Sequence, residues 1–180
     1  VWVAVNAEQA SAWLQEGKRV LYLPARVKES VEGTYCTDFW NYPMFRSISE
    51  SMGKPVPVGT MGLLIQNDHP ALAGFGAETF TTPQWYAVCS DCDCAVLEEK
   101  TAPSMRPIVQ MIDNFERNHK LGVLWEAAVG EGKLLVCTSR LQRHMDRPEI
   151  RQLVHSLLRY AGSPQFAPEE KMELGGVEEL

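Results

Sequence analysis

The sequence predicts an α/β fold, a three-layer sandwich in which helices cover both faces of a mixed, mostly parallel sheet. Short apolar runs at 19–24 and 61–65, typical of strands buried on both faces, alternate with segments that have the periodicity of helices. A glycine turn at 130–132 between two apolar runs adds an antiparallel hairpin. Because 180 residues is about the size of one domain, we expect a single body at 1–162, followed by an acidic tail at 163–180 that is loosely ordered or docked on another domain.

The first elements follow from local signals. A strand is expected at 1–5, and Asn6 is expected to cap the helix after it, with Gln9 reaching back in a capping box. Gly17 ends this helix, because glycine readily adopts the left-handed conformation of a helix C-terminus. A further helix is expected over 44–52.

Two short helices and a strand are expected in the middle of the chain. Asp68 is expected to cap the first helix, which runs through 70–72. Thr82 precedes the second helix, which has Pro83 at its first position. The apolar run 107–112 is then expected to form a strand.

The last third of the chain combines a hairpin with a long helix. The hairpin strands are expected at 122–129 and 133–137. Pro148 begins a helix that Gly162 ends. Its apolar side chains recur at helical spacing, which predicts a helix that packs on a sheet. They are Ile150, Leu153, Val154, Leu157, Leu158 and Ala161.

Charge and hydropathy exclude two classes of partner. The net charge is −6 and the basic residues form no stripe of the kind that phosphate binding needs, so we expect no nucleic-acid partner. No apolar run approaches the ~20 residues of a membrane-spanning helix, so we expect no membrane span. The opening residues 1–5 are typical of the interior of a folded element, which indicates a piece of a longer polypeptide.

The cysteines do not predict a disulfide framework, because their number is odd and they are scattered. They are Cys36, Cys89, Cys92, Cys94 and Cys137. The first, second and last are interpreted as small buried hydrophobic residues. In the run 91–94, two cysteines alternate with two aspartates; this favours a strand with one face inward over a soft-metal site, which lacks a second ligand pair. We therefore predict no metal and no cofactor.

The sequence predicts no catalytic residue. Phosphate-binding loops and the nucleophile elbow are absent, and no cysteine lies in the strand–turn–helix setting that activates a thiolate. His144 and Asp146 have the spacing of a base and its orienting acid, but the chain supplies no nucleophile for them. The favoured interpretation is a surface loop, with Asp146 near the N-terminus of the last helix.

Two segments are candidates for contact with a ligand or with another protein surface. The polar run 113–120 is either a binding loop or a hairpin end that pairs with a neighbouring surface. Its acids Asp113 and Glu116 are not taken as a glycosidase pair, which needs a separation of ~5–9 Å across a substrate. Aromatic side chains in 39–46 and the pair Trp85 and Tyr86 at a helix start either stack on sugars or pack in the core and between domains. The candidate residues are Trp40, Tyr42, Trp85, Asn114, Glu116, Arg117 and His119.

Five motifs together resemble a C-terminal region of large family 2 glycoside hydrolases, the β-galactosidase-like enzymes of Bacteroides-type bacteria. The motifs are FWNYPMFR at 39–46, GTMGLLI at 59–65, HPAL at 69–72, PIVQMIDNFERNHKLG at 107–122 and GEGKLLVC at 130–137. They occur in the same order as in that family. The resemblance covers roughly residues 19–162.

This resemblance implies a class I glutamine amidotransferase-like (flavodoxin-like) fold. The catalytic acids of such hydrolases lie on a separate (β/α)₈ barrel that nothing in this chain matches, so no catalytic residue is carried over. Related folds that are active keep a nucleophile, and this chain departs from that pattern. Amidotransferase activity is therefore not expected.

The resemblance leads to three functional hypotheses. The first is a non-catalytic C-terminal accessory domain of a periplasmic or secreted glycoside hydrolase, which packs on the catalytic and sandwich domains of the same polypeptide or builds a homo-oligomer. The second is a carbohydrate-binding module with an oligosaccharide as ligand. The third is a stand-alone hydrolase that uses His144 and a cysteine.

Overall fold

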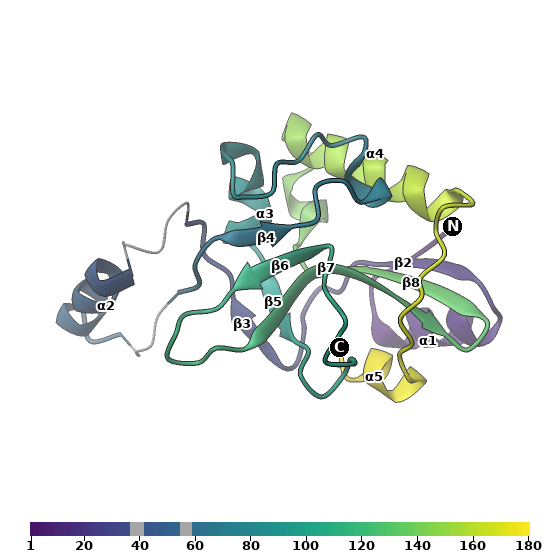
Figure 1. Ribbon diagram of the computed structural model, residues 1–180, viewed down its shortest axis with the longest axis horizontal. Helices are drawn as coiled ribbons and strands as arrows, with labels where there is room; N and C mark the ends of the chain where they lie inside the picture. Colours follow the sequence, from purple (N-terminus) through teal and green to yellow (C-terminus); the bar gives the residue numbers. More distant parts are fainter. Residues whose placement is uncertain (37–41, 55–58) are drawn as a thin grey trace.

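The computed structural model describes residues 1–36, 42–54 and 59–180, with the backbone alone for 42–45. In this part of the chain, eight strands form one open mixed sheet, accompanied by five α-helices (Figure 1). The strands are β1 (Trp2–Ala4), β2 (Arg19–Tyr22), β3 (Ser30–Glu32), β4 (Leu63–Ile65), β5 (Asp93–Val96), β6 (Val109–Ile112), β7 (Lys120–Val129) and β8 (Gly132–Cys137). The helices are α1 (Ala7–Gln15), α2 (Tyr42–Ser51), α3 (Tyr86–Ser90), α4 (Pro148–Gly162) and α5 (Leu174–Glu178). Short 3₁₀ turns are η1 (Pro70–Leu72), η2 (Pro83–Trp85) and η3 (Leu141–His144).

The long strand β7 is the centre of the sheet. Along one edge, the start of β7 pairs with β5 and the rest of β7 pairs with β8. Its other edge pairs with β6. The sheet continues through β2 and β1 beyond β8, through β3 beyond β5 and through β4 beyond β6.

The expectation of a mostly parallel sheet is wrong. Among the described strands, only the β1–β2 and β2–β8 pairs are parallel, and the other five pairs are antiparallel. Parallel neighbours need a long crossover connection, such as α1 provides between β1 and β2. The turn at Gly130, which has a φ of 57°, instead reverses the chain directly from β7 into β8.

Helices cover both faces of the sheet, as Figure 1 shows. Adjacent residues of β2 point to opposite faces: Leu21 belongs to the core with α4, whereas Val20 belongs to the core with α1 and α5. The predicted mixed α/β class with helices on both faces of a sheet is therefore confirmed. No helix in the described residues has the length and apolar character needed to cross a membrane.

Local signals predicted the first helix correctly. The Asn6 side chain accepts a hydrogen bond from the Gln9 N–H at 2.9 Å, and Gly17 has a φ of 73° at the helix end. The Gln9 side chain reaches back one residue further than a capping box requires, because it accepts from the Val5 N–H at 3.2 Å.

Two local expectations are wrong. The cap of η1 is His69, whose Nδ1 accepts from the Ala71 N–H at 3.2 Å, and not Asp68. The run 61–65 is not buried on both faces, since Leu64 is exposed. Among the described strands β4 pairs with β6 alone, so it lies at an edge of the sheet.

The segment 163–180 packs on the same body instead of lying loose or on another domain. Phe166 and Val177 are fully buried, in the cores on opposite faces of the sheet. The Ala128 N–H donates to the Glu170 carbonyl at 2.7 Å, which ties the segment to β7. An acidic composition did not reveal the apolar residues that anchor it.

Candidate functional site

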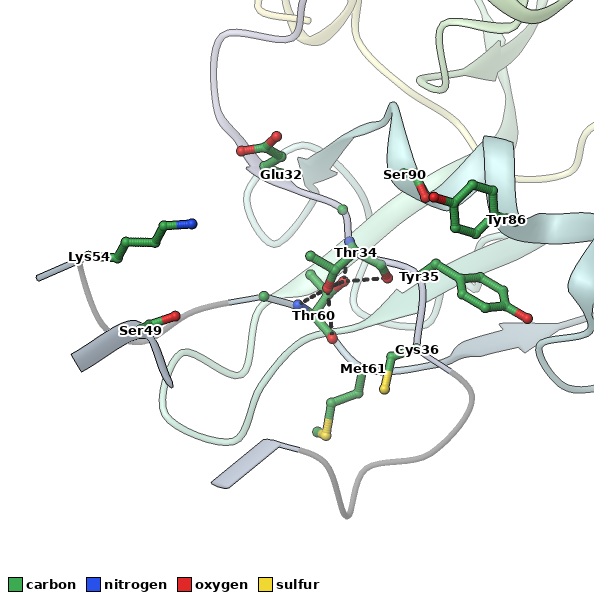
Figure 2. Close-up of a pocket in the computed structure, with 12 residues that line it drawn as sticks. Glu32, Thr34, Tyr35, Cys36, Ser49, Lys54, Thr60, Met61, Tyr86 and Ser90 are labelled. Carbon is green, nitrogen blue, oxygen red and sulfur yellow. Dashed lines mark hydrogen bonds between the residues drawn. The ribbon is translucent and has the colours of Figure 1, made fainter. Parts of the chain in front are cut away.

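A cavity of about 560 Å³ lies at the end of the molecule that bears α2 (Figure 2). It is built by the segment after β3, the segment before β4, the end of α2 and the start of α3. The side chains that give it its chemistry are Glu32, Thr34, Tyr35, Lys54, Thr60 and Tyr86.

Two threonines fix the floor of this cavity. The Thr34 N–H donates to Thr60 Oγ1 at 2.9 Å, and the Thr60 N–H donates to Thr34 Oγ1 at 2.7 Å. The two hydroxyl oxygens are 3.1 Å apart. Gly59 has a φ of 69°, and a Cβ there would lie 3.1 Å from Thr34 Oγ1, so the close approach of the two segments favours glycine.

Two tyrosines form an aromatic wall. The Tyr35 and Tyr86 ring centroids are 5.3 Å apart at 70°, and the Tyr86 ring is half-exposed. Arg147 places its guanidinium 5.8 Å from the Tyr86 centroid. The cavity combines an exposed ring with hydroxyls and with the charged side chains of Glu32 and Lys54, which suits a polar ligand that has an apolar face.

The predicted loop 113–120 supports the cavity through hydrogen bonds to Gly59, one of the residues that line it. Asn114 is fully buried, and its Nδ2 donates to the Gly59 carbonyl at 3.2 Å while its Oδ1 accepts from two loop N–H groups. Arg117 donates to the same carbonyl at 2.7 Å and pairs with Asp113 at 2.6 Å. Asn114 and Arg117 thus position the segment around Gly59.

The other candidates of the loop lie at its surface. Glu116 pairs with Arg46 of α2, so the loop and α2 are joined at this end of the molecule. His119 is exposed, and its Nδ1 lies 3.0 Å from Glu98 Oε1. These two residues are available for contact with another surface.

Among the aromatic candidates, Trp85 is placed in the core. Its ring is buried and packs edge-on against Phe75 with centroids 4.9 Å apart, so it is unable to stack on a sugar. Trp40 and the Tyr42 side chain lie outside the described residues. Tyr86, next in sequence, has the exposure that we expected of Trp85.

A comparison with protein families gives a match over residues 1–180 to DUF8487, described as a domain of unknown function. The chain belongs to this family. A comparison with curated proteins gave no match.

In this DUF8487 domain, His144 pairs with Asp91 rather than Asp146. His144 Nε2 lies 3.1 Å from Asp91 Oδ2, and Arg140 bridges Asp91 at 2.6 Å and Asp93 at 2.5 Å. Burial favours a higher pKa for the Asp91 carboxyl, but the hydrogen bonds from Arg140 and His144 outweigh it and lower that pKa.

All five cysteines of the DUF8487 domain are buried, four of them in the core on the α4 face of the sheet and Cys36 in the lining of the first cavity. Burial raises the pKa of the Cys137 thiol to about 12 and also raises the pKa of Cys89. The Cys92 and Cys94 sulfurs are 3.7 Å apart, whereas Asp93 points away from them to Arg140, so the predicted alternation of side-chain direction is confirmed. The expectation that the aspartate side faces outward is wrong, because Asp93 is buried. The described residues contain no group of three or more side chains arranged to hold a metal ion. A thiol with a raised pKa stays protonated at neutral pH and is a poor nucleophile.

Proposed function

We propose that this chain is a non-catalytic accessory domain of a periplasmic or secreted glycoside hydrolase, with a class I glutamine amidotransferase-like fold. It packs on the catalytic and sandwich domains of the same polypeptide through the end of the molecule that bears α2. The observation that carries the proposal is the exposure of large apolar side chains there: Ile48 is 46% exposed, Met52 63% and Phe115 66%.

The position of α2 supports a role in contact. α2 stands apart from the helices that cover the sheet (Figure 1). Both faces of the sheet already have their own cores, whereas Ile48 and Met52 present apolar surface to solvent. Grouped exposed apolar residues rimmed by charges, here Arg46 and Glu116, are typical of protein interfaces. The ordered motifs that resemble those of glycoside hydrolases make the rest of such a polypeptide the expected partner.

The test uses the reading frame that encodes the chain. We expect this frame to encode a glycoside hydrolase barrel, and we expect the separately produced barrel and sandwich domains to bind the chain in calorimetry. The double variant Ile48→Glu, Met52→Glu is expected to abolish binding, whereas Leu158→Glu, on the exposed side of α4, leaves it unchanged.

A reading frame without such a barrel, or equal binding by all variants, would rule the proposal out. Self-association of the chain that the same double variant removes would assign this surface to a second copy instead.

Carbohydrate binding is the second candidate function, and the cavity of about 560 Å³ favours it. The half-exposed Tyr86 ring suits the C–H face of a sugar, and Thr34 and Thr60 contribute hydroxyls to the same cavity. Titration of plant and mucin oligosaccharides is expected to give saturable binding that Tyr86→Ala weakens. Absence of saturable binding removes this candidate.

A further inference from the structure

A second cavity, of about 330 Å³, lies on the face of the sheet that α4 covers. This volume falls at the small end of the range for ligand pockets, about 300–1,000 Å³. Pro70, Met105 and Ile108 form its apolar walls, and four residues of the C-terminal segment also line it: Gln165, Ala167, Glu169 and Glu170. The cavity has no residue in common with the one in Figure 2.

Three polar side chains meet in this second cavity. The Tyr160 hydroxyl donates to Glu126 Oε2 at 2.6 Å. The other carboxylate oxygen, Oε1, lies 3.9 Å from His69 Nε2. Both side chains are largely withdrawn from solvent, since Glu126 is 17% exposed and His69 19%.

The local structure fixes which ring nitrogen of His69 carries the proton. Its Nδ1 accepts the Ala71 N–H, so in the neutral ring the proton is on Nε2, which faces Glu126. Burial lowers the pKa of His69, partly opposed by Asp68, which favours that neutral form. A donor and an acceptor therefore face each other across a gap too wide for a direct hydrogen bond.

A hydroxyl group fits this gap. Its oxygen accepts from the His69 Nε2–H, and its own hydrogen bonds to Glu126 Oε1. Burial raises the pKa of Glu126, because the carboxylate loses hydration in the protein interior. A hydrogen bond from a ligand hydroxyl offsets part of that lost hydration.

Charge selects among hydroxyl-bearing ligands. Among the described residues that line the cavity, Glu126, Glu169 and Glu170 stand against a single lysine or arginine side chain, Arg106. An anionic ligand is therefore disfavoured relative to a neutral one.

We propose that this cavity binds a small neutral polyhydroxylated molecule of monosaccharide size, with one hydroxyl held between His69 and Glu126. The apolar walls contact its C–H groups. This site is independent of both functions proposed above, since it uses none of the residues on which they rest.

D-galactose is the probe, titrated into the isotope-labelled full chain and followed by NMR at the His69 ring. Saturable shifts are expected, with tighter binding than for D-galacturonate. His69→Asn keeps an acceptor for the Ala71 N–H and removes the Nε2 donor. Glu126→Gln replaces the acceptor that faces His69 Nε2–H with an amide N–H donor. Each change is expected to weaken binding by about 10-fold or more, because each leaves one ligand hydrogen bond unmade.

Glu99→Gln, at an exposed position outside this cavity, is the matched control for Glu126→Gln and is expected to leave this binding unchanged. Melting temperatures establish that each variant is folded, and His69→Asn decides the test alone if Glu126→Gln unfolds. The proposal is overturned if D-galactose gives no saturable shift at His69, if His69→Asn binds as tightly as the parent chain, or if Glu99→Gln weakens binding as much as Glu126→Gln does.

Discussion

Arg140 joins two acidic side chains just beyond the end of β8. Its guanidinium donates to Asp91 and Asp93 and to the Ala25 carbonyl, and its side chain is buried. Asp93 is also buried, so water would do little to stabilise its negative charge if Arg140 were removed. We expect Arg140→Met to lower the free energy of unfolding by about 3–5 kcal/mol, as measured by urea denaturation.

Arg143 provides the matched control at the same acidic side chain. It lies 3.6 Å from Asp91 Oδ1 and is exposed. Exposed ion pairs contribute about 0–1 kcal/mol, so Arg143→Met is expected to change stability by no more than that. If the two variants lost the same free energy of unfolding, burial would not determine how much these ion pairs contribute to stability.

At Gly132, strand β8 closely approaches helix α1. A Cβ at this position would lie 2.7 Å from the Leu14 carbonyl oxygen and 2.9 Å from Leu14 Cα. Both atoms are backbone atoms of α1, so no side-chain rotation relieves the overlap. We expect Gly132→Ala to displace α1 from β8 and to cost about 1–3 kcal/mol in urea denaturation.

Gly175 is the control for this substitution. It lies in α5, and a Cβ there would meet no atom within 4 Å. Gly175→Ala is expected to be neutral or to stabilise the chain by up to about 1 kcal/mol. If Gly132→Ala proved equally harmless, the close packing of α1 on β8 would be refuted.

Elements were predictable where their signals are local. The Asn6 cap, the apolar stripe of α4 and the glycine turn before β8 each lie within a short stretch of sequence, and each element formed at the expected place. The stripe is narrower than predicted, because Leu158 is exposed. Strand direction was not predictable in the same way, because it depends on pairs such as Val20 with Leu134 that are distant along the chain. The mostly parallel sheet was inferred from apolar runs, which do not specify a partner.

The first cavity was missed for the same reason. Its floor depends on Thr34 and Thr60 meeting across 26 positions, and neither residue stands out locally. The sequence did mark an aromatic pair at the start of α3, but it did not show which ring is buried. Trp85 fills the core and Tyr86 faces outward, because consecutive residues on a helix point in different directions.

The whole molecule depends on its C-terminal segment. Four apolar side chains of this segment are buried, one in the core that includes α4 and three in the core that includes α1. They are Phe166, Met172, Val177 and Leu180. Full burial of such side chains contributes about 1.5–3 kcal/mol each, which is large against the ~5–15 kcal/mol total of a typical domain.

Removal of residues 163–180 is therefore expected to abolish cooperative unfolding, even though the deleted chain lies outside the predicted body at 1–162. Urea denaturation followed by tryptophan fluorescence, to which the buried Trp125 in the same core as α5 contributes, measures this. Glu169→Gln with Glu173→Gln changes only exposed positions of the segment and is expected to shift stability by no more than about 0.5 kcal/mol. A truncated chain that unfolds at the urea midpoint of the full chain would mean that the sheet is stable without this cover.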